Sequence, residues 1–200
     1  MCSKKIFGFM LFLLICITAY FVYPENEIKY QPGVLVESQP EQILIKKPEP
    51  WMKDEFTITP MAEFHVKARV LSYENYRLGK ESEISPLDLA LGWGPMSDQV
   101  NLDQIEIKQR NRWYYWKTKS LPTPQNIIIS NSANMHIIPA NIKIDAALNG
   151  IKRGSLIELS GYLVTVKADK GWTWKSSLSR NDSGDGACEI FWVDDFTFIN

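Results

Sequence analysis

His136 and Ser132 are side chains of the kind that form a hydrolytic triad, and they lie four residues apart in a segment rich in serine and asparagine. His136 could serve as the general base for Ser132, with the imidazole oriented by one of three aspartates, Asp88, Asp98 or Asp182. The chain has no G-x-S-x-G segment or other nucleophile motif. A buried histidine whose ring nitrogens hydrogen-bond the surrounding chain explains the same residues without catalysis, and we favour that interpretation.

Cys188 is the alternative nucleophile, because a cysteine beside a base such as His136 or His65 can react as a thiolate. It follows a glycine-containing turn and begins an apolar segment. Its position has the same parity as Ile190 and Trp192, so on a strand all three would face the same way. We therefore favour a small buried side chain over a catalytic one.

Aromatic side chains cluster around two basic segments, where they could bind a ligand. The candidate binding residues are Arg112, Trp113, Tyr114, Trp116, Trp172 and Trp174. On a strand, Trp113 would face the opposite side from Tyr114 and Trp116. One set can fill the core, and the other would then form a platform for a sugar, a peptide or a partner protein. Simple packing of all these rings is the alternative, and we favour it.

No metal site or cofactor is predicted. Asp182, Asp185 and Glu189 could offer oxygen ligands, but their spacing differs from that of an EF-hand loop. The chain has two histidines, and no H-x-x-x-H or C-x-x-C spacing occurs. A turn built from glycine and aspartate explains the acidic segment without a metal.

The N-terminal segment predicts a membrane anchor. Residues 6–23 carry no charge and follow Lys4 and Lys5, a length near the lower limit for a membrane-spanning helix. A cleaved signal peptide ending at Ala19 and a lipoprotein modified at Cys16 are the alternatives, but a bulky isoleucine stands where each cleavage motif needs a small residue. We favour an uncleaved signal-anchor.

The positive-inside rule then keeps the two lysines in the cytoplasm and exports the rest, as a single-pass protein of the inner (cytoplasmic) membrane with its C-terminal domain in the periplasm. Removing these lysines from the whole-chain net charge of −1 leaves about −3 for the exported part. That balance lacks the basic footprint of a nucleic-acid binder, so no nucleic acid is expected as a partner. Cys188 is the one cysteine outside the N-terminal segment, so the exported part has no intrachain disulfide.

Three regions follow from composition. Residues 1–23 are the expected anchor, residues 24–50 a proline-rich extended tether, and residues 51–200 one exported domain. Two short apolar runs within the tether, residues 33–36 and 43–45, are candidates for docking on the domain as an edge strand.

The exported domain reads as a series of short strands with one helix. Residues 85–92 predict the helix, because Ser85 can cap it, Pro86 suits its first position and Gly92 can end it. Elsewhere the pattern predicts strands at residues 64–70, from 105 through the aromatic run to 117, at 127–129 and at 187–199 with a bend near 194–195, and a loop at 130–140.

Residues 141–166 are expected to organise the fold. Residues 142–148 alternate as a half-buried strand, and a second strand follows. In this second strand Ile157 and Leu159 have the opposite parity to Val164 and Val166. Gly161 lies between the two pairs, where a bulge could exchange the buried face. A long strand that bends in this way predicts a small closed or partly open β-barrel.

Residues 153–164 resemble the strand of OB-fold barrels in which a turn glycine precedes a V-x-L-x-G-x-L/V pattern. Three further segments, SPLDLALGWGPMSD, SANMHIIPA and GDGACEIFWV, are similar to an uncharacterised family of exported or membrane-anchored bacterial proteins. That resemblance implies a location and no chemistry. We therefore expect a mainly β, OB-like module that binds an envelope protein or a glycan, with a cell-envelope hydrolase using His136 and either Ser132 or Cys188 as the alternative.

Overall fold

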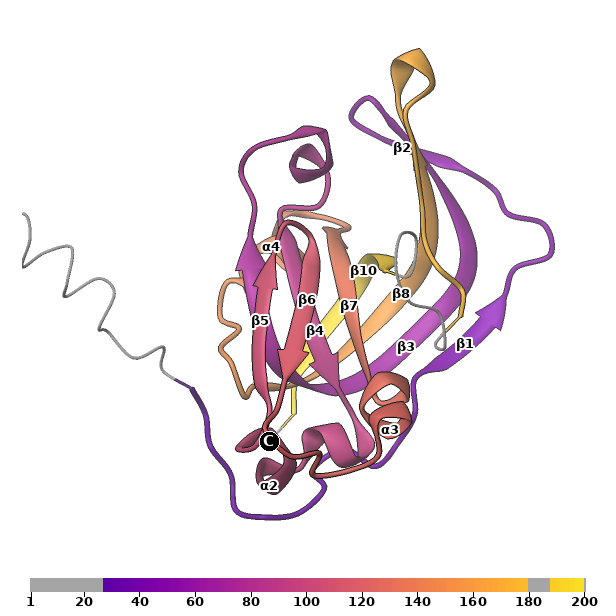
Figure 1. Cartoon of the computed structure of the whole chain (residues 1–200). Coiled ribbons are helices and arrows are strands. Elements are labelled where there is room, and N and C mark those ends of the chain that lie inside the picture. The colour runs from indigo at the N-terminus through magenta and orange to yellow at the C-terminus, as the bar shows by residue number, and fades with distance from the viewer. Residues whose placement is uncertain (1–26, 180–187, 200) are drawn as a thin grey trace, which may run out of the picture.

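Two long curved strands form the framework of the computed structural model, which describes residues 27–179 and 188–199. They are β3 (Phe56–Asn75) and β8 (Leu156–Lys167), and they pair antiparallel from Thr57 opposite Lys167 to Arg69 opposite Leu156. Figure 1 shows them curving side by side around one flank of the molecule. The strand predicted at residues 64–70 is confirmed as part of β3.

Three more strands connect β3 back to β8. These are β4 (Leu87–Gly92), β7 (Ser132–Pro139) and β10 (Glu189–Phe198). The hydrogen bonds run in the order β3–β4–β7–β10–β8–β3, with only the β7–β10 pair parallel. The predicted mainly β class is confirmed, as a mixed sheet whose bonds ring through five strands without forming a regular barrel. Along this ring β8, β3, β4 and β7 follow the 4-1-2-3 order of a Greek key.

Shorter elements surround the ring. β1 (Glu41–Leu44) and β2 (Trp51–Lys53) pair with β3, and β9 (Thr173–Lys175) pairs with β8. β5 (Glu106–Arg110) and β6 (Trp113–Lys117) form a separate hairpin. The described part of the chain has the helices α2 (Gln99–Leu102), α3 (Gln125–Ser130) and α4 (Ile142–Leu148), with short 3-10 turns η1 (Lys80–Glu83), η2 (Gly94–Ser97) and η3 (Asp169–Gly171).

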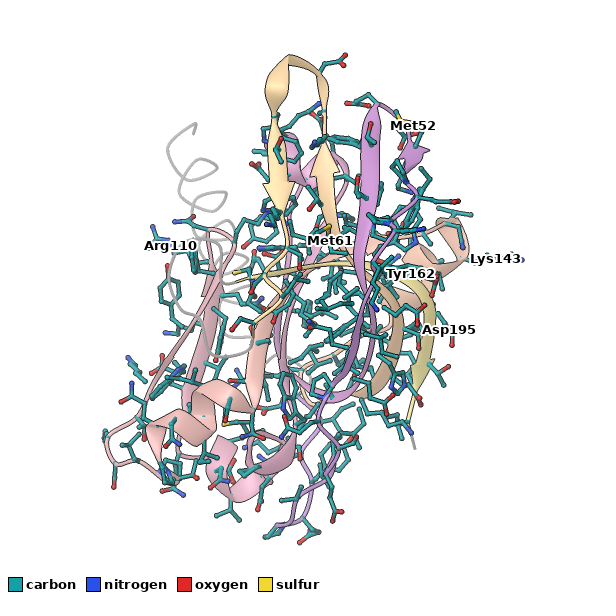
Figure 2. The ribbon with its side chains drawn as sticks, turned by 90° about the vertical axis from the view of Figure 1, so that its right-hand side faces the viewer. Met52, Met61, Arg110, Lys143, Tyr162 and Asp195 are labelled. Carbon is teal, nitrogen blue, oxygen red and sulfur yellow. The ribbon has the colours of Figure 1, made fainter. Side chains whose placement is uncertain are left out.

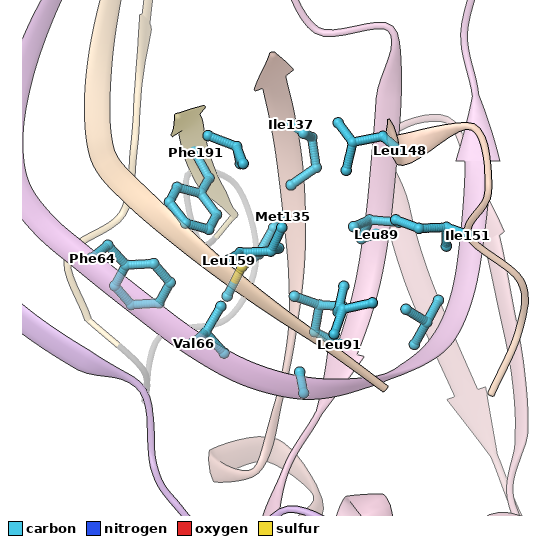
Figure 3. Packing of buried hydrophobic residues seen from close by; sticks show 14 of the residues in the cluster. Phe64, Val66, Leu89, Leu91, Met135, Ile137, Leu148, Ile151, Leu159 and Phe191 are labelled. Atoms are coloured by element: carbon cyan, nitrogen blue, oxygen red, sulfur yellow. The ribbon is translucent and has the colours of Figure 1, made fainter. Parts of the chain in front are cut away.

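The interior of the ring is apolar, and alternate residues of each strand supply it. Phe64 of β3 and Phe191 of β10 meet edge to face with ring centroids 5.0 Å apart. Leu89, Met135 and Leu159 are fully buried in the same cluster, which Figure 3 shows from close by. Burial of these side chains holds the five strands together.

β8 buries side chains on both faces. Ile157 and Leu159 lie in the ring interior, whereas Val164 and Val166 belong to a second cluster on the opposite face. The exchange of the buried face predicted at Gly161 does not occur, because Leu163, beyond Gly161, still lies in the ring cluster with Ile157 and Leu159. β8 is instead buried on both faces from Leu163 to Val166, and the extra residues lie in its two partner strands. Register shifts occur between Pro60 and Ala62 of β3 and between Val193 and Asp195 of β10, which also confirms the bend predicted in the last strand.

Residues 85–92 were expected to form a helix, and this prediction is wrong. Residues 87–92 are β4, and all six are buried. Leu87, Leu89 and Leu91 point into the ring, while Ala90 contacts a separate cluster outside it. Burial between β3 and β7 therefore outweighs the local capping signals.

Residues 142–148 were expected to form a strand, and instead they form α4. Asn141 caps the helix, because its side chain accepts hydrogen bonds from the backbone amides of Lys143 and Ile144. Leu148 is buried while Ile142 is 76% exposed, a pattern that fits helical spacing. The alternation seen in the sequence is a coincidence of composition.

Two further local predictions are wrong in the same region of the chain. Residues 127–129 lie in α3, and the expected loop at 130–140 is mostly β7. β7 is buried along nearly its whole length because it pairs with both β4 and β10. Its polar residues, which suggested a loop, face a covered surface outside the ring.

The segment before the domain contacts it closely. Residues 41–44 form β1 on the edge of β3, and Val36 is buried in the ring cluster. The predicted membrane segment and the Gly/Asp turn at 181–186 lie outside the described residues, so the three-region division stays a prediction. Within residues 27–179 and 188–199, no helix has the length and apolar character needed to cross a membrane.

Gly161 allows β8 and β10 to approach closely. Its φ is +151°, and a Cβ there would collide with the carbonyl oxygen of Trp192. We predict that Gly161→Ala lowers the free energy of unfolding by about 2–4 kcal/mol, because strain and overpacking add. Gly171→Ala is the matched control, since Gly171 also has a positive φ but no atom near the added methyl. Equal losses for the two variants in urea denaturation would contradict this role.

Candidate functional site

Asp88 and His136 face each other on the outer surface of the ring. They are register partners across the β4–β7 pair, and the leucines on either side of Asp88 point inward. His136 Nδ1 lies 2.9 Å from Asp88 Oδ1. Asp88 is fully buried and His136 is 3% exposed. A polar pair therefore lies on the outside of the ring yet is shielded from solvent.

Arg112 covers this pair from the turn of the β5–β6 hairpin. Its Nη1 donates to Asp88 Oδ1 over 2.7 Å, and its guanidinium lies 3.8 Å from the ring centroid of Tyr76. Asn111 and Arg112 have φ of +54° and +68°, the left-handed conformation of a two-residue hairpin turn. An arginine is rarely found there, and the ion pair with Asp88 compensates the backbone strain.

Aromatic rings surround the ion pair. Trp174 lies 4.7 Å from His136 and 5.9 Å from the guanidinium of Arg112. The hydroxyl of Tyr76 accepts a hydrogen bond from the backbone amide of Arg112, and burial raises the pKa of this tyrosine. Low polarity around the site strengthens the attraction between Arg112 and Asp88.

The ion pair does not satisfy every polar atom at the site. Asp88 Oδ2 and Arg112 Nη2 are buried and have no hydrogen-bond partner among the described residues. A buried carboxylate needs compensating charge or donors, so loss of Arg112 would leave Asp88 with His136 alone.

Further polar contacts continue down the outer surface of β7. Asn134 accepts from Gln109 of β5 over 2.7 Å and donates to the carbonyl of Arg112. Ser132 lies 2.6 Å from the hydroxyl of Tyr114, a tyrosine whose pKa is raised by burial. These bonds attach both strands of the hairpin to the ring.

The structure brings His136 together with Asp88, one of its three candidate aspartates, and not with Asp98 or Ser132. Asp98 caps α2, accepting from the backbone amide of Val100. Ser132 lies four residues along the same strand, about 13 Å away at ~3.3 Å per residue. Its hydroxyl also donates to the carbonyl of Ile128. Asp182 is outside the described residues.

Cys188 lies beside Asn134, just before β10. Its thiol contacts the carbonyl of Arg112 at 3.9 Å and the amide of Asn134 at 3.8 Å. Cys188 therefore borders the polar surface on which His136 lies. Among the described residues, no group of histidine, cysteine and acidic side chains could hold a metal ion.

The aromatic residues predicted to bind a ligand lie in three different environments. Tyr114 and Trp116 face inward and pack on a cluster between the hairpin and β4. Trp172 and Trp174 pack on the second cluster beside Phe56. Trp113 belongs to the opposite, outer face of the hairpin, so the candidate binding residues do not share one surface.

The outer face of the hairpin combines aromatic and basic side chains. Cross-strand pairing places Arg110 opposite Trp113 and Lys108 opposite Tyr115, which is 55% exposed. Figure 2 shows Arg110 at one margin of the molecule, on the opposite side from Lys143 and Asp195. We call these four residues, Lys108, Arg110, Trp113 and Tyr115, the hairpin platform.

Glu106 lies at the base of the hairpin between two lysines. Its carboxylate is 2.6 Å from Lys108 and 2.9 Å from Lys117. Hydrogen bonds from Lys108 and then Lys117 lower the pKa of Glu106 to about 2. Glu106 therefore neutralises part of the charge of Lys108. Arg110, the other cation of the platform, has no ion pair among the described residues.

Tyr76 and a second aromatic group were missed in the sequence. Trp51 meets Trp192 at 5.1 Å and Tyr162 at 5.8 Å on the outer side of the β2–β3–β8–β10 surface. These residues come from three distant segments, so no local pattern indicates the group. The dipeptide Asn111-Arg112 between two alternating runs could have indicated the hairpin turn.

Comparisons of this chain with protein-family models, with curated proteins and with solved structures found no match.

The buried ion pair gives a stability prediction. Asp88→Asn and Arg112→Met should each lower the free energy of unfolding by about 3 kcal/mol, because the first leaves the largely buried Arg112 and the second the fully buried Asp88 without its ion-pair partner. The double variant should lose about 2 kcal/mol less than the sum of the two single losses. Denaturant titrations of the four chains measure this coupling.

Glu55→Gln serves as the control for that experiment. Glu55 pairs with Lys80 at 3.0 Å, but both side chains are well exposed. Removal of an exposed pair should change stability little. Strict additivity of the Asp88 and Arg112 losses would show that their contact contributes nothing.

Proposed function

We propose that this chain is a membrane-anchored extracytoplasmic binding module built on an OB-like ring. The Greek-key order of β8, β3, β4 and β7, closed by β10, supports the OB-like assignment. In OB-folds the face of the second and third strands binds ligands. The corresponding strands here are β4 and β7, and their outer face carries the buried Asp88–Arg112–His136 group.

The hairpin covers this face, and its own outer surface then becomes the contact surface. The observation that carries the proposal is the hairpin platform, which presents Trp113, Tyr115 and Arg110 on a ribbon whose inner side is fixed by buried polar bonds. Tryptophan, tyrosine and arginine are the residues that contribute most to binding at protein interfaces. A ribbon fixed before binding loses little conformational entropy on association.

The partner class follows from shape and charge. Small-molecule sites are concave and enclose most of the ligand, whereas a two-stranded ribbon has no enclosing walls. Arg110, which has no ion pair within residues 27–179 and 188–199, favours a carboxylate, and the rings favour flat apolar contact. We therefore assign an acidic segment of another envelope protein as the partner, with an acidic glycan as the alternative outcome of the test.

The location completes the proposal. An uncleaved signal-anchor at residues 6–23 would hold the module on the outer side of the cytoplasmic membrane, because the flanking lysines favour the cytoplasm. The exported part carries a net charge of about −3, which disfavours nucleic acid as the partner.

Photo-crosslinking in cells tests the platform. A photoreactive phenylalanine analogue in place of Tyr115 should give a discrete crosslinked protein band in the full-length chain. Arg110→Ala combined with Trp113→Ala should reduce that band at least about tenfold, the effect of losing interface residues that each contribute more than 1 kcal/mol. Lys143→Ala, an exposed residue of α4, is the matched control and should leave the band unchanged.

Two results would contradict this function. An unchanged band in the double variant would exclude the platform as the contact surface. A crosslinked product that glycosidase converts back to the mass of the uncrosslinked chain would assign the partner to glycan.

A hydrolase is the second candidate, and the hydrogen bond between His136 and Asp88 is the observation that favours it. A carboxylate on Nδ1 orients an imidazole as a general base, and Cys188 borders the same surface. If this function holds, alkylation of Cys188 by iodoacetamide should slow at least about tenfold in His136→Gln, because the thiolate loses its base. Equal alkylation rates in the two chains would exclude this pair.

A further inference from the structure

The first described residues are fixed to one end of the ring. Residues 28–36, which we call the strap, run beneath η2 and α2 in Figure 1. The amide of Tyr30 donates to the Gln99 side chain and that of Gly33 to Asp98, both over 3.0 Å. The amide of Val36 donates to Ser97 Oγ, also over 3.0 Å. The strap is therefore hydrogen-bonded to the ring end at three points along its length.

A buried arginine fastens the start of the strap. Arg69 of β3 is 1% exposed, and its guanidinium donates to the carbonyls of Ser97 and Ile28 at 3.1 and 3.2 Å. It also lies 5.0 Å from the ring centroid of Tyr30. Desolvation lowers the pKa of Arg69, so its several hydrogen bonds are needed to hold it there. Movement of Ile28 away from the ring would break this arrangement.

The chain length then limits how far this end can lie from the membrane. The apolar segment at residues 6–23 ends five residues before Ile28, whose amide is bonded to the carbonyl of Arg153. Five fully extended residues span at most about 17 Å. The end of the domain that carries the strap and α2 must stay within that distance of the bilayer.

This end also has a surface suited to lipid headgroups. A hollow of about 820 Å³ is lined by four basic residues, Lys29, Lys117, Lys119 and Arg153. Glu27, Asp103 and Glu106 share it, and each is paired with one of these cations. Lys119 has no ion pair among the described residues.

Apolar side chains accompany these charges. Val34 of the strap is 43% exposed, Val100 of α2 is 46% exposed, and Leu121 just after Lys119 is 51% exposed. Exposed apolar side chains next to lysines are typical of surfaces that contact the headgroup region.

We propose that this end of the domain, which we call the α2 end, docks on the surface of an anionic bilayer. Lys119 and the rim of the hollow contact lipid phosphates, and Val100 and Leu121 enter the headgroup layer. The inference rests on the anchor of the proposed function and adds an orientation to it. Figure 1 shows the hairpin turn and β2 far from α2, so the turn that carries Arg112 is directed away from the membrane.

Relaxation measurements on the full-length chain in nanodiscs test this orientation. The discs contain anionic phosphatidylglycerol and a small fraction of lipid whose headgroup chelates gadolinium, which broadens nearby methyl signals. We expect several-fold stronger broadening for Val100 and Leu121 than for Met52 of β2 and Ile142 of α4, which are 62% and 76% exposed. Lys119→Glu should weaken the broadening at Val100 and Leu121, whereas Lys143→Glu should not.

The outcomes separate the two proposals. A chain that fails to copurify with the discs overturns the anchor and the docking together. A chain that copurifies but shows equal broadening at all four methyl positions, or stronger broadening at Met52, overturns the docking and leaves the anchor intact.

Discussion

The carboxylate of Asp88 is the constraint on which the two layers of this protein depend. It is fully buried on the outer surface of the ring and shares its oxygen between Arg112 and His136. An isolated buried carboxylate would be strongly destabilising, so the hairpin must bring Arg112 to it. The need for this charge explains why the hairpin turn has an arginine in a left-handed conformation.

The hairpin and β9 are arranged so that they cover the outer surface of β4 and β7. A ring of five strands has an apolar interior, and the outer surface of β4 and β7 would otherwise face water. The hairpin closes over it with Ile107, Tyr114 and Trp116, and β9 adds Trp174 beside His136. The same covering leaves the platform residues on the outside, where contact with a partner requires no rearrangement of the ring.

Strands with one buried face could be predicted from the alternation of apolar and polar residues. Predictions were wrong for a strand that is buried on both faces. β3 and β10 were recognisable from parity. The opposite parity of Ile157 and Val164 comes from burial on both faces of β8 and not from the bulge predicted at Gly161. The segment that forms β4 was predicted as a helix because Ser85 and Gly92 are typical helix-capping residues. Its burial on both faces depends on strands that are distant in the sequence. The segment that forms α4 was predicted as a strand because its apolar and polar residues alternate by chance, although Asn141 is a typical helix N-cap residue.

The candidate site was partly predictable for the same reason. Asp88 was one of three aspartates proposed as the partner of His136 from residue type alone, and the β4–β7 register places these two residues opposite each other. The role of Arg112 could not be derived, because a continuous strand was expected where the chain turns at Asn111. Tyr76 joins the site from the residue just after β3, far from Arg112 in the sequence, so local patterns do not reveal the contact.

Hydrogen exchange of the unmodified chain tests the central claim most directly. If the buried ion pair fastens the hairpin to the ring, the paired amides of β5 and β6 should exchange as slowly as those of β7, through the same cooperative opening. Rapid exchange throughout the hairpin while β7 stays protected would show that the two layers are not joined, and would contradict the account.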